Sequence, residues 1–329
     1  MSTPACAPAL SICIVNWNTC ALLHDCLASL FADADSARWE VLVADNASSD
    51  GSAEMVRATF PQVHLIACHQ NLGFAGGNNL ALAQALGRFL LLLNSDTRVQ
   101  PGGLGRMLAY MEAHPAVGAA GPMLLNEDGT VQLSCGRTPG LGLAALDKLL
   151  LHKVFPLFRL GRWNHAQIRD VGWVTGACLL VRRQVVEEVG LLDSRMFMCY
   201  EDLEWCMRIR QAGWKVAYYP FSRVVHLRGQ STRQNLAGML VVSQQSLFYL
   251  FQKHIGSGRL HALRALTVTE TVLRSGAWAL PALLGRRRRR EARQRLRAYA
   301  TILWRTLTDR SYWSPRDHAP GTAHGDTRT

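Results

Sequence analysis

Short apolar runs alternate with helix-compatible segments along the first part of the chain. The four apolar runs are Ser11–Val15, Trp39–Ala44, Val63–Ala67 and Phe89–Leu93. The segments between them cover Cys20–Phe31, Ser52–Phe60 and Ala75–Leu86. Strands that alternate with helices at this spacing form parallel sheets with helices on their faces. The pattern therefore predicts an α/β fold with a mainly parallel central sheet flanked by helices.

Regular periodicity is interrupted after the next two predicted elements, a helix at Gly102–His114 and a strand near Val117–Leu124. Leu125–Asp170 has little periodicity, so we expect a long irregular excursion there. Regular patterns then return. We expect a strand at Gly172–Arg182 and a helix at Tyr200–Ala212, which ends at Gly213. Two further strands are expected at Val216–Tyr219 and Arg223–Leu227.

The last third of the chain is expected to form a separate helical part. Its pattern is helical from Asn235, with a break at Gly256–Gly258, and the residues from Pro315 onward are polar. We therefore predict three parts: an α/β unit at residues 1–234, a basic helical appendage at 235–314 and a disordered tail at 315–329. The α/β unit is expected to have two halves, residues 1–124 and 125–234.

Positive charge is concentrated in this appendage. The 329 residues have a formal net charge of +12, and residues 245–329 hold 16 Lys and Arg against 5 Asp and Glu. The rest of the chain is nearly neutral. A block this lopsided favours contact with a polyanion over a merely solvated surface. Apolar residues make up 49% of the chain, which is enough for a substantial core and excludes wholesale disorder.

Cysteine usage and hydropathy favour a cytosolic protein. The nine cysteines include no CxxC pair, and Cys13 and Cys178 lie inside apolar runs, so we expect reduced core residues. The first ten residues lack the basic start and apolar stretch of a secretory signal. Ala265–Leu284 comes nearest to a membrane span but contains Glu270 and Arg274.

Polar side chains follow the ends of two predicted strands. Asn94-Ser95-Asp96 comes directly after the run Phe89–Leu93, and Asp45 ends an earlier strand. Ligands of parallel sheets bind beyond the carboxyl ends of the strands. A carboxylate and an amide there can hold a hard cation such as Mg²⁺ or Mn²⁺, which would neutralise a diphosphate. The alternative is a turn that closes each strand.

A glycine-rich loop and helix start follow the third predicted strand at Asn71–Asn79. Three glycines in five residues let a ligand approach the backbone, and the helix start offers N–H groups to an anion. The spacing differs from the GxGxxG dinucleotide fingerprint. A tight loop that serves only packing is the alternative.

An acidic pair opens the later helix. Glu201 and Asp202 are adjacent, so they point about 100° apart and cannot both face one reactant. Asp202, Trp205 and Ile209 recur at helical spacing, which would put Asp202 at the cleft end of a buried stripe. An acidic start favoured by the helix dipole is the alternative. His226 closes the last strand and is either a ligand or a structural residue.

Taken together, seven segments in order resemble the inverting glycosyltransferases of family 2, in particular the rhamnosyltransferase-like branch. They are IVNWN, VADNASSDGS, NLGFAGGNN, LLNSD, WVTGACLLVRR, MFMCYEDLEWCMRIRQAGW and VVHLRGQS. The resemblance covers about Ser11–Gly256 and implies a GT-A fold, with a nucleotide-sugar half at residues 1–124 and an acceptor half at 125–234.

The resemblance also implies roles for individual residues. Asp45 would contact a pyrimidine base through the N3–H that uracil and thymine share, which leaves UDP and dTDP open. The family's Asp-x-Asp metal motif is here Asn94-Ser95-Asp96, so Asp96 would carry the Mg²⁺ or Mn²⁺, with His226 as a further contact. Asp202 would be the catalytic base beside Glu201. The residues expected at the nucleotide sugar are Asn16, Asp45, Asn71, Gly73, Phe74, Gly76, Asn78 and Asn94.

The implied activity is inverting transfer of L-rhamnose from dTDP-L-rhamnose to a glycan acceptor, expected to be lipid-linked, in bacterial surface polysaccharide synthesis. A UDP-hexose donor is the alternative. A polymerising synthase would carry a QxxRW-like motif and membrane spans, and a phosphodolichol-type transferase a full Asp-x-Asp. The non-enzyme alternative is a nucleic-acid-binding module, which Arg286–Arg290 suggests. Such a module would need a basic surface with aromatic residues, and the front domain is neutral, so no nucleic acid is expected as a partner.

The basic appendage is expected to dock on the anionic inner face of the cytoplasmic membrane. Leu247–Phe251 and Ala277–Leu284 would supply apolar surface beside the positive charge of Arg286–Arg290, Arg293, Arg295 and Arg297. Interfacial segments combine these two features. The alternative is a basic helical part that packs on the catalytic domain or pairs with another subunit.

Overall fold

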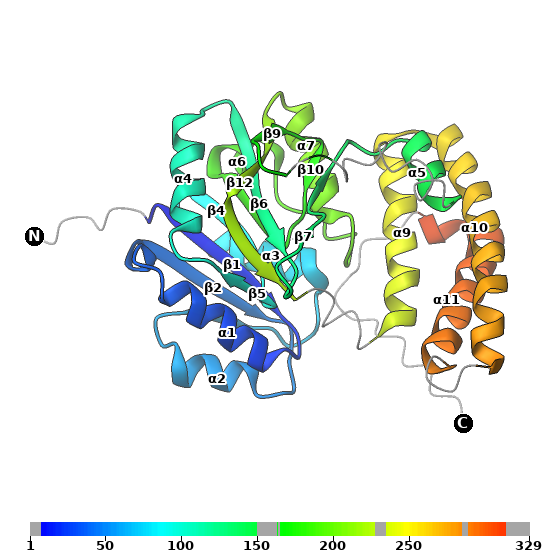
Figure 1. Cartoon of the computed structure of the whole chain (residues 1–329), viewed down its shortest axis with the longest axis horizontal. Coiled ribbons are helices and arrows are strands. Elements are labelled where there is room, and N and C mark those ends of the chain that lie inside the picture. The colour runs from blue at the N-terminus through cyan, green and yellow to red at the C-terminus, as the bar shows by residue number, and fades with distance from the viewer. Residues whose placement is uncertain (1–7, 150–162, 164, 228–234, 285–288, 314–329) are drawn as a thin grey trace, which may run out of the picture.

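The computed structural model describes residues 8–149, 163, 165–227, 235–284 and 289–313. Figure 1 shows a central sheet with helices on both faces and, beside it, a bundle of helices. The prediction for residues 315–329 lies outside the described residues, as does that for Arg286–Arg288.

The first half of the sheet is parallel. Its elements in chain order are β1 (Leu10–Asn16), α1 (Cys20–Phe31), β2 (Trp39–Asp45), α2 (Ser52–Thr59), β3 (His64–Ala67), α3 (Gly73–Gln84) and β4 (Phe89–Asn94). Strands pair in the order β3-β2-β1-β4, all parallel. The apolar run Phe89–Leu93 is at most 3% exposed at every position, as expected of a strand covered on both faces.

The second half of the sheet is mixed. Its described elements are β5 (Thr97–Val99), α4 (Gly103–Ala113), β6 (Val117–Leu125), β7 (Val131–Gln132), β8 (Cys135–Gly136), α5 (Leu141–Lys148), β9 (Arg169–Asp170), β10 (Trp173–Val174), β11 (Cys178–Arg182), α6 (Arg183–Val189), α7 (Glu201–Gln211) and β12 (Lys215–His226). The order continues β4-β11-β6-β12-β5, with β11 antiparallel to both of its neighbours and β12 parallel to β6. The predicted α/β class is confirmed, with antiparallel strands added.

Several predicted boundaries differ from the structure. The strand expected at Gly172–Arg182 is two strands, β10 and β11, and α6 was not predicted. The two strands expected after Gly213 are one, β12, whose register shifts between Tyr219 and Arg223. Pro220 lies in this interval and cannot donate a hydrogen bond to the ladder, which explains why the sequence read as two segments.

The helical bundle consists of α5, α9 (Leu236–His254), α10 (Ser257–Leu284) and α11 (Arg289–Thr308). The Asn235 side chain caps α9 by accepting from the backbone N–H of Gly238 at 3.0 Å. The expected break falls between α9 and α10, where Gly256 has a φ of +104°. No helix in the described part of the chain is long and apolar enough to span a membrane.

One predicted surface is wrong. Leu247–Phe251 was expected to offer apolar surface to a membrane, but Phe248, Leu250 and Phe251 are all 0% exposed. Leu250 packs with Met196, Leu203 and Met207 against the sheet domain, and the two phenylalanines pack inside the bundle. These side chains therefore pack in the protein interior, within the bundle and between the bundle and the sheet domain, and do not form an apolar surface.

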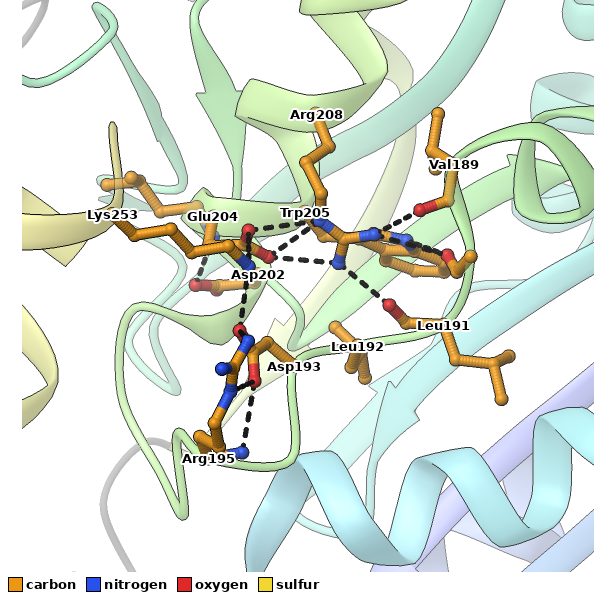
Figure 2. A network of polar contacts seen from close by, with 12 residues as sticks. Val189, Leu191, Leu192, Asp193, Arg195, Asp202, Glu204, Trp205, Arg208 and Lys253 are labelled. Atoms are coloured by element: carbon orange, nitrogen blue, oxygen red, sulfur yellow. Dashed lines mark hydrogen bonds and ion pairs between the residues drawn. The ribbon is translucent and has the colours of Figure 1, made fainter. Parts of the chain in front are cut away.

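Charged side chains join the bundle to α7 (Figure 2). Glu204 is 0% exposed and accepts hydrogen bonds from Arg208 in its own helix and from Lys253 and His254 in α9. Lys253 also donates to Asp193 at 2.7 Å. Burial alone would raise the pKa of Glu204, but these three partners lower it to about 2. The acidic helix that contains Asp202 is therefore clamped to α9.

Candidate active site

A cavity of about 250 Å³ opens at the carboxyl ends of β1, β2 and β4. This is the edge where ligands of α/β sheets bind. Its lining residues are Val15, Trp17, Asn46, Asn71, Gly73, Phe74, Asn94, Ser95, Asp96, Phe197, Met198, Asn235 and Met239. Of the residues expected at the site, Asn71, Gly73, Phe74, Asn94 and Asp96 are in this lining. The others lie around it, as the following paragraphs describe.

Asp45 and Asn16 lie side by side because β1 and β2 pair in parallel with these two residues in register. The Asn16 amide donates to Asp45 Oδ1 at 2.9 Å, and the backbone N–H of Ser48 donates to Oδ2 at 3.0 Å. Asp45 is only 3% exposed. Its carboxylate is thus held in one orientation at the strand edge, with lone pairs left to accept a further N–H.

The glycine loop is fastened to the segment before α7. Gly73 has a φ of +72°, and a Cβ there would lie 2.2 Å from the carbonyl oxygen of Phe197. The backbone N–H of Phe74 donates to the same oxygen at 2.8 Å. Only glycine fits this position. Gly76 and Asn78 lie further along α3, where the Asn78 amide donates to the carbonyl of Phe74 at 3.0 Å.

His226 is oriented by a chain of hydrogen bonds that starts at Asp128. The Thr130 hydroxyl donates to the Asp128 carboxylate at 2.6 Å, and the Thr130 oxygen accepts from the Asn126 amide at 2.9 Å. The Asn126 oxygen accepts from the Gln132 amide at 2.8 Å, and the Gln132 oxygen faces His226 Nδ1 at 2.7 Å. Because an ionised carboxylate can only accept, the chain has one direction, and Nδ1 carries a proton.

The other ring nitrogen faces the expected metal ligand. His226 Nε2 lies 3.2 Å from Asp96 Oδ1 and 3.3 Å from the Asn94 amide nitrogen. Metal-binding histidines usually donate their other N–H to a neighbouring oxygen, as Nδ1 does here to Gln132. Three His, Cys, Asp or Glu side chains grouped for a metal are not found among the described residues. Asp96 and His226 therefore fit a divalent cation whose remaining ligands are oxygens of a bound molecule.

The adjacent carboxyl groups of α7 are in different surroundings. Asp202 is half-buried and accepts from the backbone N–H groups of Gly176 and Leu203, each at 2.7 Å. Burial raises the pKa of Asp202, although these hydrogen bonds and the Thr175 hydroxyl oppose the shift. Glu201 is 5% exposed and its Oε2 has no hydrogen-bond partner in the described part of the chain.

Burial raises the pKa of Glu201 well above its usual range, and the neighbouring charge of Asp202 raises it further. Burial therefore disfavours the charged form of Glu201, whose Oε2 has no hydrogen-bond donor among the described residues, whereas the backbone N–H groups at Asp202 favour the charged form of that carboxyl. A Cβ built on Gly176 would lie within 3.2 Å of both the Phe74 ring and the Asp202 Cβ. Asp202 is therefore next to a lining residue of the cavity. Trp205 and Ile209 are both 0% exposed, which confirms the predicted buried stripe.

Sequence reasoning did not single out part of the cavity wall. Trp17, Phe197, Met198 and Met239 are apolar, so their residue types carry no signal for a ligand. Just beyond Met198, Cys199 and Tyr200 both have a φ near +70° (71° and 69°), a conformation that non-glycine residues rarely adopt. Such backbone strain gathers at functional sites.

Comparison with known proteins decides the family. The model of "Glycosyl transferase family 2" matches residues 11–190, which is more than half of the chain. The chain belongs to glycosyltransferase family 2. It is 31% identical over 237 residues to the N-acetylglucosaminyl-diphospho-decaprenol L-rhamnosyltransferase of Mycobacterium tuberculosis, an alignment that covers 66% of this chain and 76% of that protein.

A second relative of this family 2 chain is the dTDP-rhamnosyl transferase RfbF of Shigella flexneri. The two sequences are 24% identical over an alignment that covers 63% of this chain and 66% of that protein. Among solved structures, a mannosyltransferase from Pyrobaculum calidifontis, in complex with GDP-Man and Mn²⁺, matches with a TM-score of 0.57 and 18% identity, over 93% of this chain and 89% of that one. The chain is therefore a glycosyltransferase with the GT-A fold, and it has rhamnosyltransferases among its relatives.

Proposed function

We propose that the protein transfers L-rhamnose from dTDP-L-rhamnose, with inversion, to a glycan acceptor linked through a diphosphate to a lipid. The product would enter bacterial surface polysaccharide. The names of the two rhamnosyltransferase relatives support the sugar and the acceptor class. The observation that carries the proposal is the place of Asp202: two backbone N–H groups hold its carboxylate next to Phe74, which lines the cavity, and burial raises its pKa.

Asp202 would act as the general base. A base whose pKa is raised toward the working pH takes a proton more effectively from an acceptor hydroxyl as that hydroxyl attacks the sugar. The N–H groups of Gly176 and Leu203 hold the carboxylate in place for this step. Glu201 is the neighbouring residue of the same helix, so its side chain points about 100° away from that of Asp202 and would not face the same reactant as a nucleophile. A single displacement, and hence inversion, follows.

Asp45 would bind the pyrimidine base, and the loop Asn71–Phe74 would line the sugar diphosphate. A carboxylate accepts the N3–H of thymine and of uracil equally, so a UDP-hexose is the alternative donor. Asp96 and His226 would hold Mg²⁺ or Mn²⁺. When bound, such a cation offsets the charge that develops on the departing diphosphate. Asn94 lies beside both ligands.

We also propose that the enzyme works on the inner face of the cytoplasmic membrane. Arg290, Arg293 and Arg297 are exposed at helical spacing on α11, and the same stripe continues through Trp304 and Leu307, which are 62% and 63% exposed. Interfacial helices combine cationic and large apolar side chains in this way. This stripe takes the place of the buried Leu247–Phe251 as the supporting observation.

A donor panel tests the activity. The purified protein is incubated with dTDP-L-rhamnose, UDP-glucose, UDP-galactose and GDP-mannose and a short-chain N-acetylglucosaminyl-diphospholipid, and transfer is followed by mass spectrometry. Transfer only from dTDP-L-rhamnose is expected. Asp202→Asn should lower turnover about 10²–10⁴-fold with donor binding unchanged, because the amide cannot take the proton. Near-normal turnover by this variant would move the base elsewhere.

Sedimentation with vesicles tests the location. Binding to vesicles that contain phosphatidylglycerol should be strong at low salt and weak at high salt. Replacement of Arg290, Arg293 and Arg297 by Gln should abolish it, whereas Arg259→Gln, on the exposed start of α10, should not. Failure of the wild-type protein to bind such vesicles at low salt contradicts the proposed location.

A further inference from the structure

A second cavity, of about 240 Å³, lies inside the helical bundle. It adjoins the first one: Phe197 and Met198 line the first cavity, and Tyr200, two residues before Asp202, lines the second. In α9 the neighbouring residues Met239 and Leu240 line the first and the second cavity, respectively. The second cavity is thus within reach of a molecule whose hydroxyl approaches Asp202.

Cationic groups dominate its wall. Lys148 is 6% exposed, and its Nζ donates to Glu270 at 2.7 Å and to Gln244 at 2.8 Å. Glu270 also accepts from Arg274 Nε at 2.8 Å, so one carboxylate serves two cations. Arg295 adds a third cation and pairs with Glu291, which lies outside the lining. The wall therefore carries more positive than negative charge.

Two donors on this wall have hydrogen-bonding capacity to spare. Tyr299 is 5% exposed and lines the cavity, and its hydroxyl has no partner among the described residues. Arg274 uses only its Nε within the described part of the chain, so its terminal nitrogens remain available. Buried polar groups are normally paired. A hydroxyl and a guanidinium that both line a positively charged cavity indicate an anionic ligand.

We propose that this cavity binds the diphosphate of the acceptor. The inference rests on the proposed function, since the acceptor there is a sugar-diphospho-lipid. Guanidinium, ammonium and phenol groups are strong donors to phosphate oxygens. Asp96 and His226 lie in the first cavity region and are assigned to the donor's diphosphate, so the two diphosphates have separate sites. The acceptor sugar then lies between them, at Asp202.

Steady-state kinetics test the site with a water-soluble, short-chain N-acetylglucosaminyl-diphospholipid. Arg274→Gln and Tyr299→Phe should each raise the acceptor KM about tenfold or more, with the donor KM and donor hydrolysis within twofold of wild type. Arg259→Gln is the matched control and should change neither. For an alkyl N-acetylglucosaminide without phosphate, the acceptor KM should be the same in the wild type and the variants. The proposal would be overturned if the variants had the same KM for the diphospholipid as the wild type, or if their KM rose equally for both acceptors.

A binding measurement keeps this test separate from the proposed activity. Inorganic pyrophosphate is titrated calorimetrically into protein saturated with dTDP, which fills the donor site. Wild type and Arg259→Gln should bind it, and Arg274→Gln should lose most of the affinity. If pyrophosphate binds to the three proteins in this way but the wild type glycosylates no acceptor, the anion site is supported and the proposed function fails. No binding by the wild type, or equal binding by Arg274→Gln, refutes the site.

Discussion

Glu204→Gln should loosen the junction between α7 and the helical bundle. The buried carboxylate accepts from Arg208 at 3.0 Å, from Lys253 at 2.7 Å and from His254 at 2.9 Å. The amide keeps the shape of Glu204 but takes its negative charge away from Arg208 and Lys253. Removing one partner of a buried ion pair typically destabilises by about 3–5 kcal/mol. Lys253 retains Asp193, and Arg208 retains main-chain carbonyls such as that of Leu191, so the lower end applies.

The pKa of Glu204 gives a similar magnitude. It is lowered from 4.5 to about 2, and each pKa unit corresponds to roughly 1.4 kcal/mol, so the charged form contributes about 3 kcal/mol. Because the folded pKa is depressed, this contribution is present above pH 4.5 and is lost as the pH falls toward 2. Wild-type stability should therefore fall over that range more steeply than that of Glu204→Gln.

Thermal unfolding followed by tryptophan fluorescence, at pH 7 and at intervals down to pH 3, measures both effects. Glu204→Gln should melt about 5–10 °C below wild type at pH 7, and the gap should narrow as the pH falls. Glu187→Gln, an exposed glutamate on α6, is the matched control and should melt with the wild type. A Glu204→Gln melting point within 2 °C of wild type at pH 7, or a gap independent of pH, would refute this reasoning.

Three further variants test the donor side of the cavity. Asp45→Ala should raise the donor KM more than it lowers turnover, since contacts to the base are alike in ground and transition states; a pure loss of turnover contradicts this. Asp96→Ala should weaken dTDP binding and remove its dependence on Mn²⁺, whereas wild-type activity that survives EDTA would exclude the metal role. Gln132→Met should lower the affinity for Mn²⁺, measured by electron paramagnetic resonance, about 10–100-fold. Gln132→Glu should retain the affinity, because a carboxylate also accepts from His226 Nδ1. Equal Mn²⁺ affinity in the wild type and both variants would contradict the role of Gln132 in fixing the proton on Nδ1.

The parallel half of the sheet was predictable because its signal is local. A fully apolar run such as Phe89–Leu93 can be satisfied only by burial on both faces, and the polar residues that end each strand must then gather at one edge. Asn94 and Asp96 meet His226 for this reason, although Asp96 and His226 are 130 positions apart in the sequence. Spacing likewise predicted the buried face of α7.

The remainder depends on contacts between distant segments. Leu247–Phe251 has the same composition whether it faces lipid or a protein core, and only the packing of α9 against Met196 and Leu203 decides between them. The hydrogen-bond partners that orient His226, from Asn126 to Gln132, lie in the stretch without periodicity, where hydrogen-bond partners have no fixed spacing. Phe197 and Met198 line the cavity because Gly73 lets two loops touch, a contact that no local pattern encodes.

The central claim is sugar transfer by a single displacement in which Asp202 takes the acceptor proton. Its most direct measurement is the anomeric configuration of the product formed from dTDP-β-L-rhamnose and the N-acetylglucosaminyl-diphospholipid, determined by nuclear magnetic resonance from the one-bond carbon–hydrogen coupling at the anomeric carbon. The account predicts an α-L-rhamnoside, formed by the wild type and essentially absent with Asp202→Asn. A β-linked product, or equal product formation by Asp202→Asn, would contradict it.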